Sequence, residues 1–293
     1  MPTEYMPIDG ADRYAVFGNP VGHSLSPRIH AMFAQQTGQD MIYTAICPPL
    51  DGFAAAVAAF AAQGGRGANV TVPFKEQAFR LAQNLTPRAQ AAGAVNTLSF
   101  AQGEISGDNT DGAGLVRDIT VNLGRGLRGA RILILGAGGA ARGVILPLLA
   151  WQPASIFIAN RTAEKAARLA ADFQVNGGGF AALANQTFDL VINATSAGLS
   201  NAVLPTPALC LPCTPFGSPA GTFASGALAY EMLYGRATPF MQSASAAGAQ
   251  VADGLGMLVE QAAEAFFVWR GVRPQTAPVL AELRASPRAA LSR

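Results

Sequence analysis

Short apolar runs alternate with Ala/Leu-rich segments of helical character along the whole chain. In the first third, Tyr14–Phe17 and Met41–Ile46 are predicted strands, and Phe53–Ala62 is a predicted helix. Ser26 and Pro27 are typical of the cap and the first position of a helix. The pattern adds strands at Asn69–Val72, Ala94–Ser99 and Glu104–Ser106, and a helix at Lys75–Ala82. This alternation predicts βαβ units and mostly parallel sheets.

The second half of the chain contains a different kind of strand. Arg131–Leu135 is too apolar for a strand with one wet face, which is typical of a central parallel strand. Pro205–Gly226 is rich in Pro, Gly, Ser and Thr and is a predicted loop. The other predicted elements are a helix at Ala113–Thr120, strands at Ser155–Ala159, Leu190–Ala194 and Leu228–Met232, and a long helix from Gly254 to Trp269.

Length, charge and cysteine content narrow the class of protein. A chain of 293 residues suits two domains. The net charge of +2 is spread out, without the Lys/Arg block of a nucleic-acid or membrane-surface binder. No apolar run reaches the ~20 residues of a membrane span, and the N-terminus lacks the pattern of a signal peptide. The odd set Cys47, Cys210 and Cys213, with only two histidines, indicates a reducing, cytoplasmic location and no metal site.

A glycine-rich turn follows the apolar strand Arg131–Leu135 directly. Its pattern is G-x-G-x-x-A, the fingerprint of a Rossmann-type dinucleotide site, and its residues are Gly136, Ala137, Gly138, Gly139, Ala140 and Ala141. Gly136 permits the tight turn, Gly138 admits a pyrophosphate, and Ala141 keeps the next helix close to the sheet. Because a strand precedes this turn and a helix follows it, the sequence predicts nucleotide binding there.

The tip of the next predicted strand indicates which dinucleotide is bound. An acidic residue there would hold the ribose 2′-hydroxyl of NAD, but the chain has Asn160, Arg161 and Thr162. A guanidinium can grip a 2′-phosphate with two hydrogen bonds, and Lys165 lies one turn further on. The sequence therefore predicts NADP.

Polar residues also gather beside the strand ends of the first third. They lie in S-L-S-P, N-V-T-V-P-F-K, A-V-N-T and G-D-N-T-D-G, and they are Ser24, Ser26, Asn69, Thr71, Lys75, Asn96 and Asp111. Most of these side chains end in hydroxyl or amide groups. Such a set can hydrogen-bond several hydroxyls at once, so it suits a small, hydroxyl-rich ligand.

Taken together, these stretches resemble the shikimate dehydrogenase family. The matching motifs include F-G-N-P-V-G-H-S-L-S-P, N-V-T-V-P-F-K-E, G-D-N-T-D-G, G-A-G-G-A-A-R, N-A-T-S-A-G and A-D-G-L-G-M-L-V-E-Q-A, and they occur in family order from about Tyr14 to Gly271. No single motif is decisive, but the ordered set is specific. Two positions depart from the family pattern: Glu231 stands before Met232 where the family usually has Asp, and Lys165 stands where it often has Arg.

The resemblance implies a reaction and a role for each matching residue. The reaction is the reversible, NADPH-dependent reduction of 3-dehydroshikimate to shikimate in aromatic amino acid biosynthesis. Ser24 and Ser26 would bind the substrate carboxylate, and Lys75 and Asp111 would be the catalytic pair. Asn69, Thr71, Asn96 and Gln261 would reach the ring hydroxyls, Tyr234 would contact the substrate, and Met232, Gly254 and Met257 would line the nicotinamide pocket.

The chemistry of the proposed pair agrees with the reaction. Hydride reduction of a ketone leaves negative charge on oxygen, which a lysine ammonium can stabilise and protonate. An aspartate nearby can hold Lys75 and accept a hydrogen bond from a substrate hydroxyl. Whether Lys75 transfers the proton or only stabilises charge stays open at this point.

The expected architecture is α/β with two domains. Residues 1–112 plus 246–293 would form a discontinuous substrate-binding domain, and 113–245 a Rossmann-type NADP-binding domain. A monomer or homodimer is expected. Three alternatives remain: a quinate/shikimate dehydrogenase with relaxed selectivity, a non-catalytic NADP-binding regulator, and an enzyme similar to methylene-tetrahydrofolate dehydrogenase. The serine pair disfavours the folate enzyme, and Arg161 argues against NAD.

Overall fold

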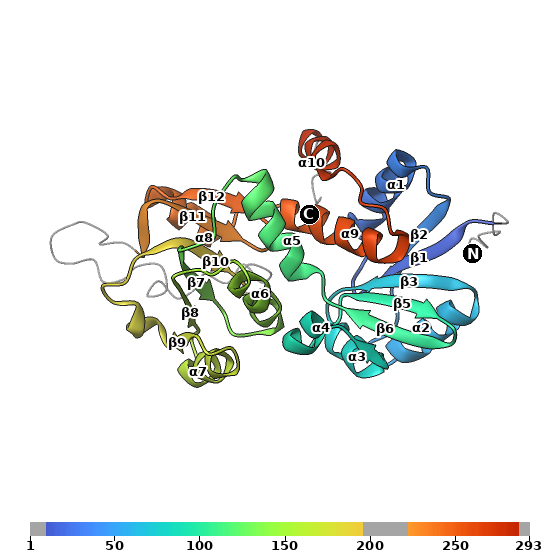
Figure 1. The fold of residues 1–293 in the computed structure, drawn as a ribbon, viewed down its shortest axis with the longest axis horizontal. Coiled ribbons are helices and arrows are strands. Elements are labelled where there is room, and N and C mark those ends of the chain that lie inside the picture. The colour runs from blue at the N-terminus through green and yellow to red at the C-terminus, as the bar shows by residue number, and fades with distance from the viewer. Residues whose placement is uncertain (1–9, 196–221, 287–293) are drawn as a thin grey trace. The chain divides into compact units, whose positions relative to one another are not determined.

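The computed structural model describes residues 10–195 and 222–286, which form two compact units (Figure 1). The first unit contains Met1–Thr110 and Ala262–Leu283, and the second contains Asp111–Gln261 and Arg284–Arg293. The chain therefore returns to the first unit later than the predicted residue 246. The reason is β12 (Gln250–Asp253), which pairs in parallel with β11 (Phe223–Glu231) inside the second unit.

The sheet of the first unit is mixed. Its order is β2-β1-β3-β5-β6-β4; β1 is parallel to β2 and β3, whereas β5 is antiparallel to both β3 and β6. The strands are β1 (Asp12–Phe17), β2 (Met41–Ile46), β3 (Gly65–Val70), β4 (Asn84–Leu85), β5 (Thr97–Ala101) and β6 (Glu104–Asp108). The helices are α1 (Ser26–Thr37), α2 (Phe53–Ala62), α3 (Lys75–Leu81), α4 (Pro87–Ala92) and α10 (Thr276–Ala285).

Both faces of this sheet are buried. On one face, Phe17 and Val70 pack with residues of α2, α3 and α4. On the other face, α1 and the later part of α9 (Leu255–Arg270) contribute an aromatic cluster in which the His30 ring stacks on Tyr43 at 4.1 Å. His30 is fully buried, and this burial lowers its pKa to about 3. The imidazole is therefore neutral at physiological pH and serves as an aromatic core residue.

The second unit has the strand order of a dinucleotide-binding fold. All its strands are parallel, in the order β12-β11-β10-β7-β8-β9, which is 3-2-1-4-5-6 when read from β9 with β7 counted as the first strand. Its further strands are β7 (Arg131–Leu135), β8 (Ser155–Ala159), β9 (Asn176–Gly178) and β10 (Phe188–Asn193). The topological switch point, where ligands bind in such sheets, lies between β7 and β10.

Alternating side chains of β7 divide the core of this unit. Ile132 and Ile134 pack with residues of α5, α6, α7 and α9, whereas Leu133 and Leu135 pack with residues of α8. The helices are α5 (Asp111–Arg117), the π-helical turn η1 (Asp118–Asn122), α6 (Gly139–Leu149), α7 (Ala163–Asp172), the 3-10 turn η2 (Phe180–Leu183) and α8 (Pro239–Ala246). This arrangement confirms the predicted α/β class and the covered central strand.

Several predicted elements need correction. The strand predicted at Asn69–Val72 is Gly65–Val70, and the last residues of the predicted loop, 223–226, already belong to β11. Most of that loop, including Cys210 and Cys213, lies outside the described residues. Within the described residues, no helix is long and apolar enough to cross a membrane.

Candidate active site

Five predicted substrate residues lie at or beside one end of the strands of the first sheet: Ser24, Ser26, Asn69, Thr71 and Asn96. The parallel strands β1, β2 and β3 all end at this edge of the sheet. Antiparallel β5 begins there, because Thr97 pairs with Asn69, and β6 ends there, because Asp108 pairs with Thr97. The loops that follow or precede these strand ends carry the polar motifs, so the topology brings together residues that are up to 72 positions apart, from Ser24 to Asn96.

The two serines lie at the start of α1. The helix begins at Ser26, and its cap position is Leu25, so the prediction that Ser26 is the cap was wrong. Instead, the Ser24 hydroxyl accepts a hydrogen bond from the Ser26 backbone N–H at 3.2 Å. This bond fixes the two serines relative to each other.

Asn69 and Asn96 are held by a network of hydrogen bonds. The Asn69 amide donates to the Asn96 carbonyl at 3.1 Å, and its Oδ1 accepts from the Tyr43 hydroxyl at 2.7 Å. The Asn96 Oδ1 accepts the backbone N–H of Thr110 at 2.8 Å. Both asparagines are at least 94% buried, so each amide has a fixed orientation. Tyr43 and Thr110 were missed by sequence reasoning; a tyrosine inside a strand pattern gives no sign that its hydroxyl serves an asparagine.

The proposed catalytic side chains begin two different helices. Lys75 is the first residue of α3, and its carbonyl accepts the backbone N–H of Val95 at 2.9 Å, which joins it to the segment before Asn96. Asp111 is the first residue of α5 and directly follows Thr110. Thr71, also on this edge, is tied to β1 by donating its backbone N–H to Phe17.

An ion pair between the buried Asp108 and the partly buried Arg88 supports the G-D-N-T-D-G segment. Arg88 donates two hydrogen bonds to Asp108, at 2.6 and 2.5 Å, and a third to Glu264 at 3.0 Å. Asp108 also accepts the backbone N–H of Asn109. Burial raises the pKa of Asp108, but the bonds from Arg88 and Thr86 outweigh it, so the pKa is lowered. The first aspartate of the motif is thus structural, which the sequence pattern alone does not reveal.

We expect Arg88→Met to destabilise the protein by about 3 kcal/mol, because Asp108 would keep a buried charge without its partner. Urea unfolding measures this change, and Arg88→Met with Asp108→Asn should recover part of it. Since the folded pKa of Asp108 lies below its ordinary 3.8, its contribution is present above that pH and fades as pH falls. The loss of stability caused by Arg88→Met should therefore become smaller as the pH falls below about 4.

Arg131→Met is the matched control, since Arg131 also binds an aspartate, Asp189, through two guanidinium nitrogens. Both side chains of that pair are more than 40% exposed, so we expect a loss of only about 0–1 kcal/mol. An equal loss in the two single variants would contradict the structural role of the Arg88 pair.

The glycine-rich turn of the second unit fits a dinucleotide. Gly136 has φ +107°, a conformation that favours glycine, and its N–H donates to Ala159 on β8 at 2.8 Å. A Cβ at Gly138 or Gly139 would meet no atom within 4 Å, so the turn has open space beside it. Gly138 offers no side chain to cap α6, which leaves the first N–H groups of the helix for phosphate. Ala137 and Ala140 complete the turn, and Ala141 is fully buried against the sheet.

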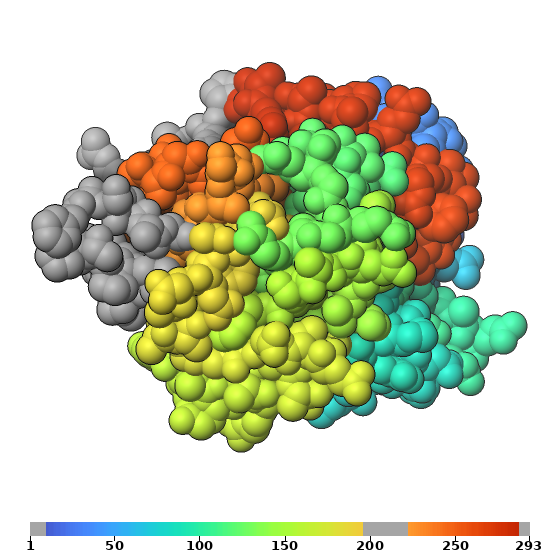
Figure 2. Space-filling model, turned by 60° about the vertical axis from the view of Figure 1, so that its left-hand side comes forward, coloured from blue at the N-terminus to red at the C-terminus, as the bar shows by residue number. Residues whose placement is uncertain are grey.

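The proposed 2′-phosphate residues lie just after β8. Arg161, Thr162 and Lys165 are exposed at the start of α7, which is part of the yellow-green surface in Figure 2. Thr162 occupies the cap position of α7 but makes no side-chain cap bond, and Asn160 donates to the Thr162 carbonyl at 3.1 Å. This cationic helix start fits a phosphate better than a ribose hydroxyl.

The proposed nicotinamide residues come from the turn after β11, which contains Met232, and from the start of α9, where Gly254 precedes the helix and Met257 lies in its first turn. Gly254 packs so closely on the Met232 carbonyl that a Cβ would collide with it. Gly114 on α5 lies close to the backbone of α9. A Cβ added at Gly114 would lie 2.7 Å from the Gln261 nitrogen and 2.8 Å from the Met257 carbonyl oxygen, so a larger residue would collide there. Met257 is buried in the core, Gln261 is buried, and Tyr234 is half-buried, which raises the pKa of its phenol.

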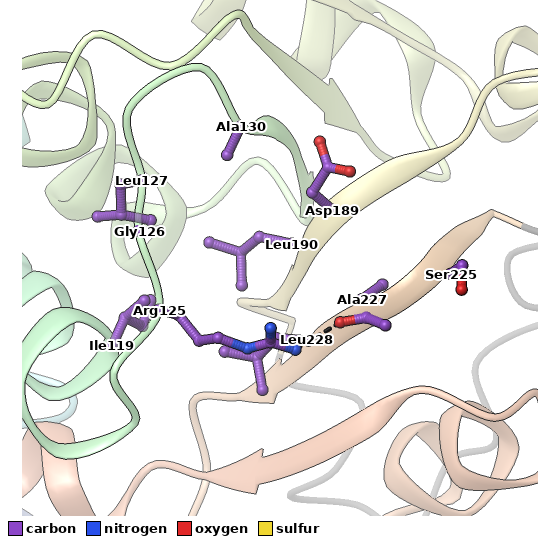
Figure 3. A pocket seen from close by; sticks show the side chains of 11 residues that line it. Ile119, Arg125, Gly126, Leu127, Ala130, Asp189, Leu190, Ser225, Ala227 and Leu228 are labelled. Carbon is purple, nitrogen blue, oxygen red and sulfur yellow. Dashed lines mark hydrogen bonds between the residues drawn. The ribbon is translucent and has the colours of Figure 1, made fainter.

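A cavity of about 210 Å³ lies elsewhere in the second unit (Figure 3). It is lined by residues of the segment before β7, such as Arg125 and Ala130, and by residues near the amino ends of β10 and β11, such as Asp189 and Ser225. The glycine-rich turn follows the opposite, carboxyl end of β7, so this cavity is not the dinucleotide site. Among the described residues, no group of three or more His, Cys, Asp or Glu side chains could hold a metal ion.

Comparisons with known proteins agree with this geometry. Residues 16–98 match the model of the shikimate dehydrogenase substrate binding domain, 119–203 that of shikimate/quinate 5-dehydrogenase, and 254–284 that of the shikimate 5′-dehydrogenase C-terminal domain. The chain is 62% identical to the NADP(+) shikimate dehydrogenase of Dechloromonas aromatica, over 94% of this chain and 98% of that one. It is 59% identical to the enzyme of the same name from Methylobacillus flagellatus, over 94% and 100%.

Solved structures give the same result. An Ael1 enzyme from Pseudomonas putida is 47% identical, with a TM-score of 0.84 over 93% of this chain and 98% of that one. Shikimate 5-dehydrogenase of Thermus thermophilus, in complex with NADP(H) and shikimate, is 32% identical, with a TM-score of 0.80 over 93% and 98%. This chain belongs to the shikimate dehydrogenase family.

Proposed function

We propose that this protein is an NADP-dependent shikimate dehydrogenase, which interconverts 3-dehydroshikimate and shikimate in aromatic amino acid biosynthesis. The observation that carries the proposal is the coexistence, in one family member, of a polar sheet edge and a glycine-rich turn followed by Arg161. Relatives that are 62% and 59% identical over nearly their full length bear this name. A 32% identical structure holds both NADP(H) and shikimate.

The first unit supplies groups suited to a hydroxylated carboxylic acid. Ser24 and Ser26 would bind the carboxylate, Asn69, Thr71, Asn96 and Gln261 would bind ring hydroxyls, and Tyr234 would contact the substrate. The asparagines are held by neighbours before a ligand arrives, as the Tyr43 and Thr110 hydrogen bonds show. Such preorganisation reduces the entropy that binding costs.

The second unit supplies the groups for the cofactor. Gly136–Ala141 would hold the pyrophosphate, Asn160, Arg161, Thr162 and Lys165 the 2′-phosphate, and Met232, Gly254 and Met257 the nicotinamide. Bound NADPH provides the hydride. Lys75 would stabilise negative charge on the substrate oxygen and donate a proton from Nζ, while Asp111 would orient Lys75 and accept a hydrogen bond from a substrate hydroxyl.

The decisive assay combines purified protein with shikimate or quinate and with NADP or NAD, in all four pairs, while absorbance of the reduced nicotinamide is followed. We expect fast reduction of the nicotinamide only when shikimate is combined with NADP. Comparable rates with quinate or NAD would favour a relaxed quinate/shikimate dehydrogenase. NADPH binding without turnover of either acid would favour a regulator and overturn the proposal.

A further inference from the structure

Glu231, the last residue of β11, is a fully buried carboxylate that the proposed mechanism does not use. Its Oε2 accepts hydrogen bonds from the Asn193 amide at 2.7 Å and from the Thr238 hydroxyl at 2.8 Å. Its Oε1 accepts the backbone N–H of Leu233 at 3.1 Å. Three donors therefore converge on one side chain inside the second unit.

The direction of each bond is fixed by backbone N–H groups, which can only donate. Asn193 must turn its amide nitrogen toward Glu231, because its Oδ1 accepts the Thr195 backbone N–H at 3.2 Å. The Thr238 hydroxyl accepts the Met241 N–H at 3.3 Å, so its proton is available to Glu231. Every neighbour thus donates, and only a group with acceptors on both oxygens satisfies them all.

These bonds join three segments near the carboxyl ends of the strands. Asn193 ends β10 and begins the N-A-T segment, Leu233 belongs to the turn after β11, and Thr238 caps α8. The same turn is further tied by Met232 N–H to the Asn193 carbonyl at 3.1 Å and by Gly254 N–H to the Leu233 carbonyl at 3.0 Å. Met232 and Gly254, both proposed nicotinamide residues, are therefore fixed through the segment that Glu231 holds.

We infer that Glu231 is a positioning residue for the cofactor site: its carboxylate holds the Met232–Leu233 turn in the conformation that receives the nicotinamide end of NADP. This inference rests on the proposed function. A glutamine in its place would always turn its NH2 group toward a donor, at either Leu233 or the Asn193–Thr238 side. Because a buried donor would then be unsatisfied, the turn would shift to relieve it.

The test measures NADPH affinity directly, by fluorescence titration, in two variants. Glu231→Gln should raise the Kd for NADPH by about tenfold, and Thr238→Val, which removes one donor, by about threefold. Thermal unfolding identifies any variant that does not fold, and if Glu231→Gln fails to fold, Thr238→Val decides alone.

Two control variants separate positioning from general destabilisation. Asp189→Asn changes a carboxylate that accepts three bonds from Arg131 at the opposite end of β10, and Thr238→Ser keeps both hydroxyl bonds. Both should bind NADPH like the wild type. A Kd within twofold of wild type in a folded Glu231→Gln or Thr238→Val variant would overturn the inference. A wild-type protein inactive toward shikimate would refute the proposed function instead, while the NADPH titrations would still decide this inference.

Discussion

Replacement of Lys75 by methionine should lower kcat for shikimate oxidation by about a thousandfold or more, while NADPH affinity and thermal stability stay close to wild type. General acid–base catalysis contributes about 10²–10⁴-fold and charge stabilisation a similar factor, and both roles fall on the Lys75 side chain. Its ammonium donates the proton in the reduction direction, and its amine accepts the proton of the substrate hydroxyl in the oxidation direction. Methionine keeps the length and the apolar stem of the side chain. The backbone tie from Val95 to the Lys75 carbonyl does not depend on the side chain.

The chain offers a matched control for this change, because its only other lysine is Lys165. Lys165→Met removes the same charge from an exposed position on α7. We expect it to raise KM for NADP by severalfold and to leave kcat nearly unchanged. Stopped assays with shikimate and NADP, together with NADPH titration, give both quantities. Near-normal kcat in a folded Lys75→Met variant would remove Lys75 from the mechanism.

Elements with strong hydrophobic patterns were predictable to the residue. Met41–Ile46, Phe53–Ala62, Arg131–Leu135 and Ser155–Ala159 have the predicted bounds. The missed strands, β4, β9 and β12, have only two to four residues, and β9 reads Asn-Gly-Gly. Such strands form because a neighbouring strand offers free backbone groups, and this tertiary effect leaves little trace in local sequence.

In the candidate site, too, the residues were predictable from the sequence but their tertiary contacts were not. Residue types and motif order were enough to nominate Ser24, Asn69 and Asn96, which the topology then brings to one sheet edge. Their hydrogen-bond partners were not predictable, because the Tyr43–Asn69 bond depends on the pairing of β1 with both β2 and β3. Buried carboxylates such as Asp108 and Glu231 were likewise invisible, since a sequence does not say which donors will face an acid.

The cofactor preference gives the second large expected effect. Arg161→Asp should raise KM for NADP at least a hundredfold and change KM for NAD much less. A charge-assisted bidentate bond contributes roughly 1.5–3 kcal/mol, or about 10–100-fold, and a carboxylate in its place adds repulsion of the 2′-phosphate. The new acid would also stand at the tip of β8, where NAD-binding proteins place the group that holds the ribose hydroxyl.

Arg168→Asp tests whether this effect belongs to the position or to the net charge. Arg168 is exposed on α7, seven residues beyond Arg161, so its replacement by aspartate changes the charge of this region by the same amount. Long-range attraction between exposed charges is largely screened beyond about 8 Å at physiological salt, whereas a direct bidentate contact is not. Arg168→Asp should therefore raise KM for NADP only slightly, and raising the salt concentration should abolish that rise. If the two variants weakened NADP equally, or if Arg161→Asp weakened NAD as much as NADP, then Arg161 would act through general electrostatics and the 2′-phosphate would be recognised elsewhere.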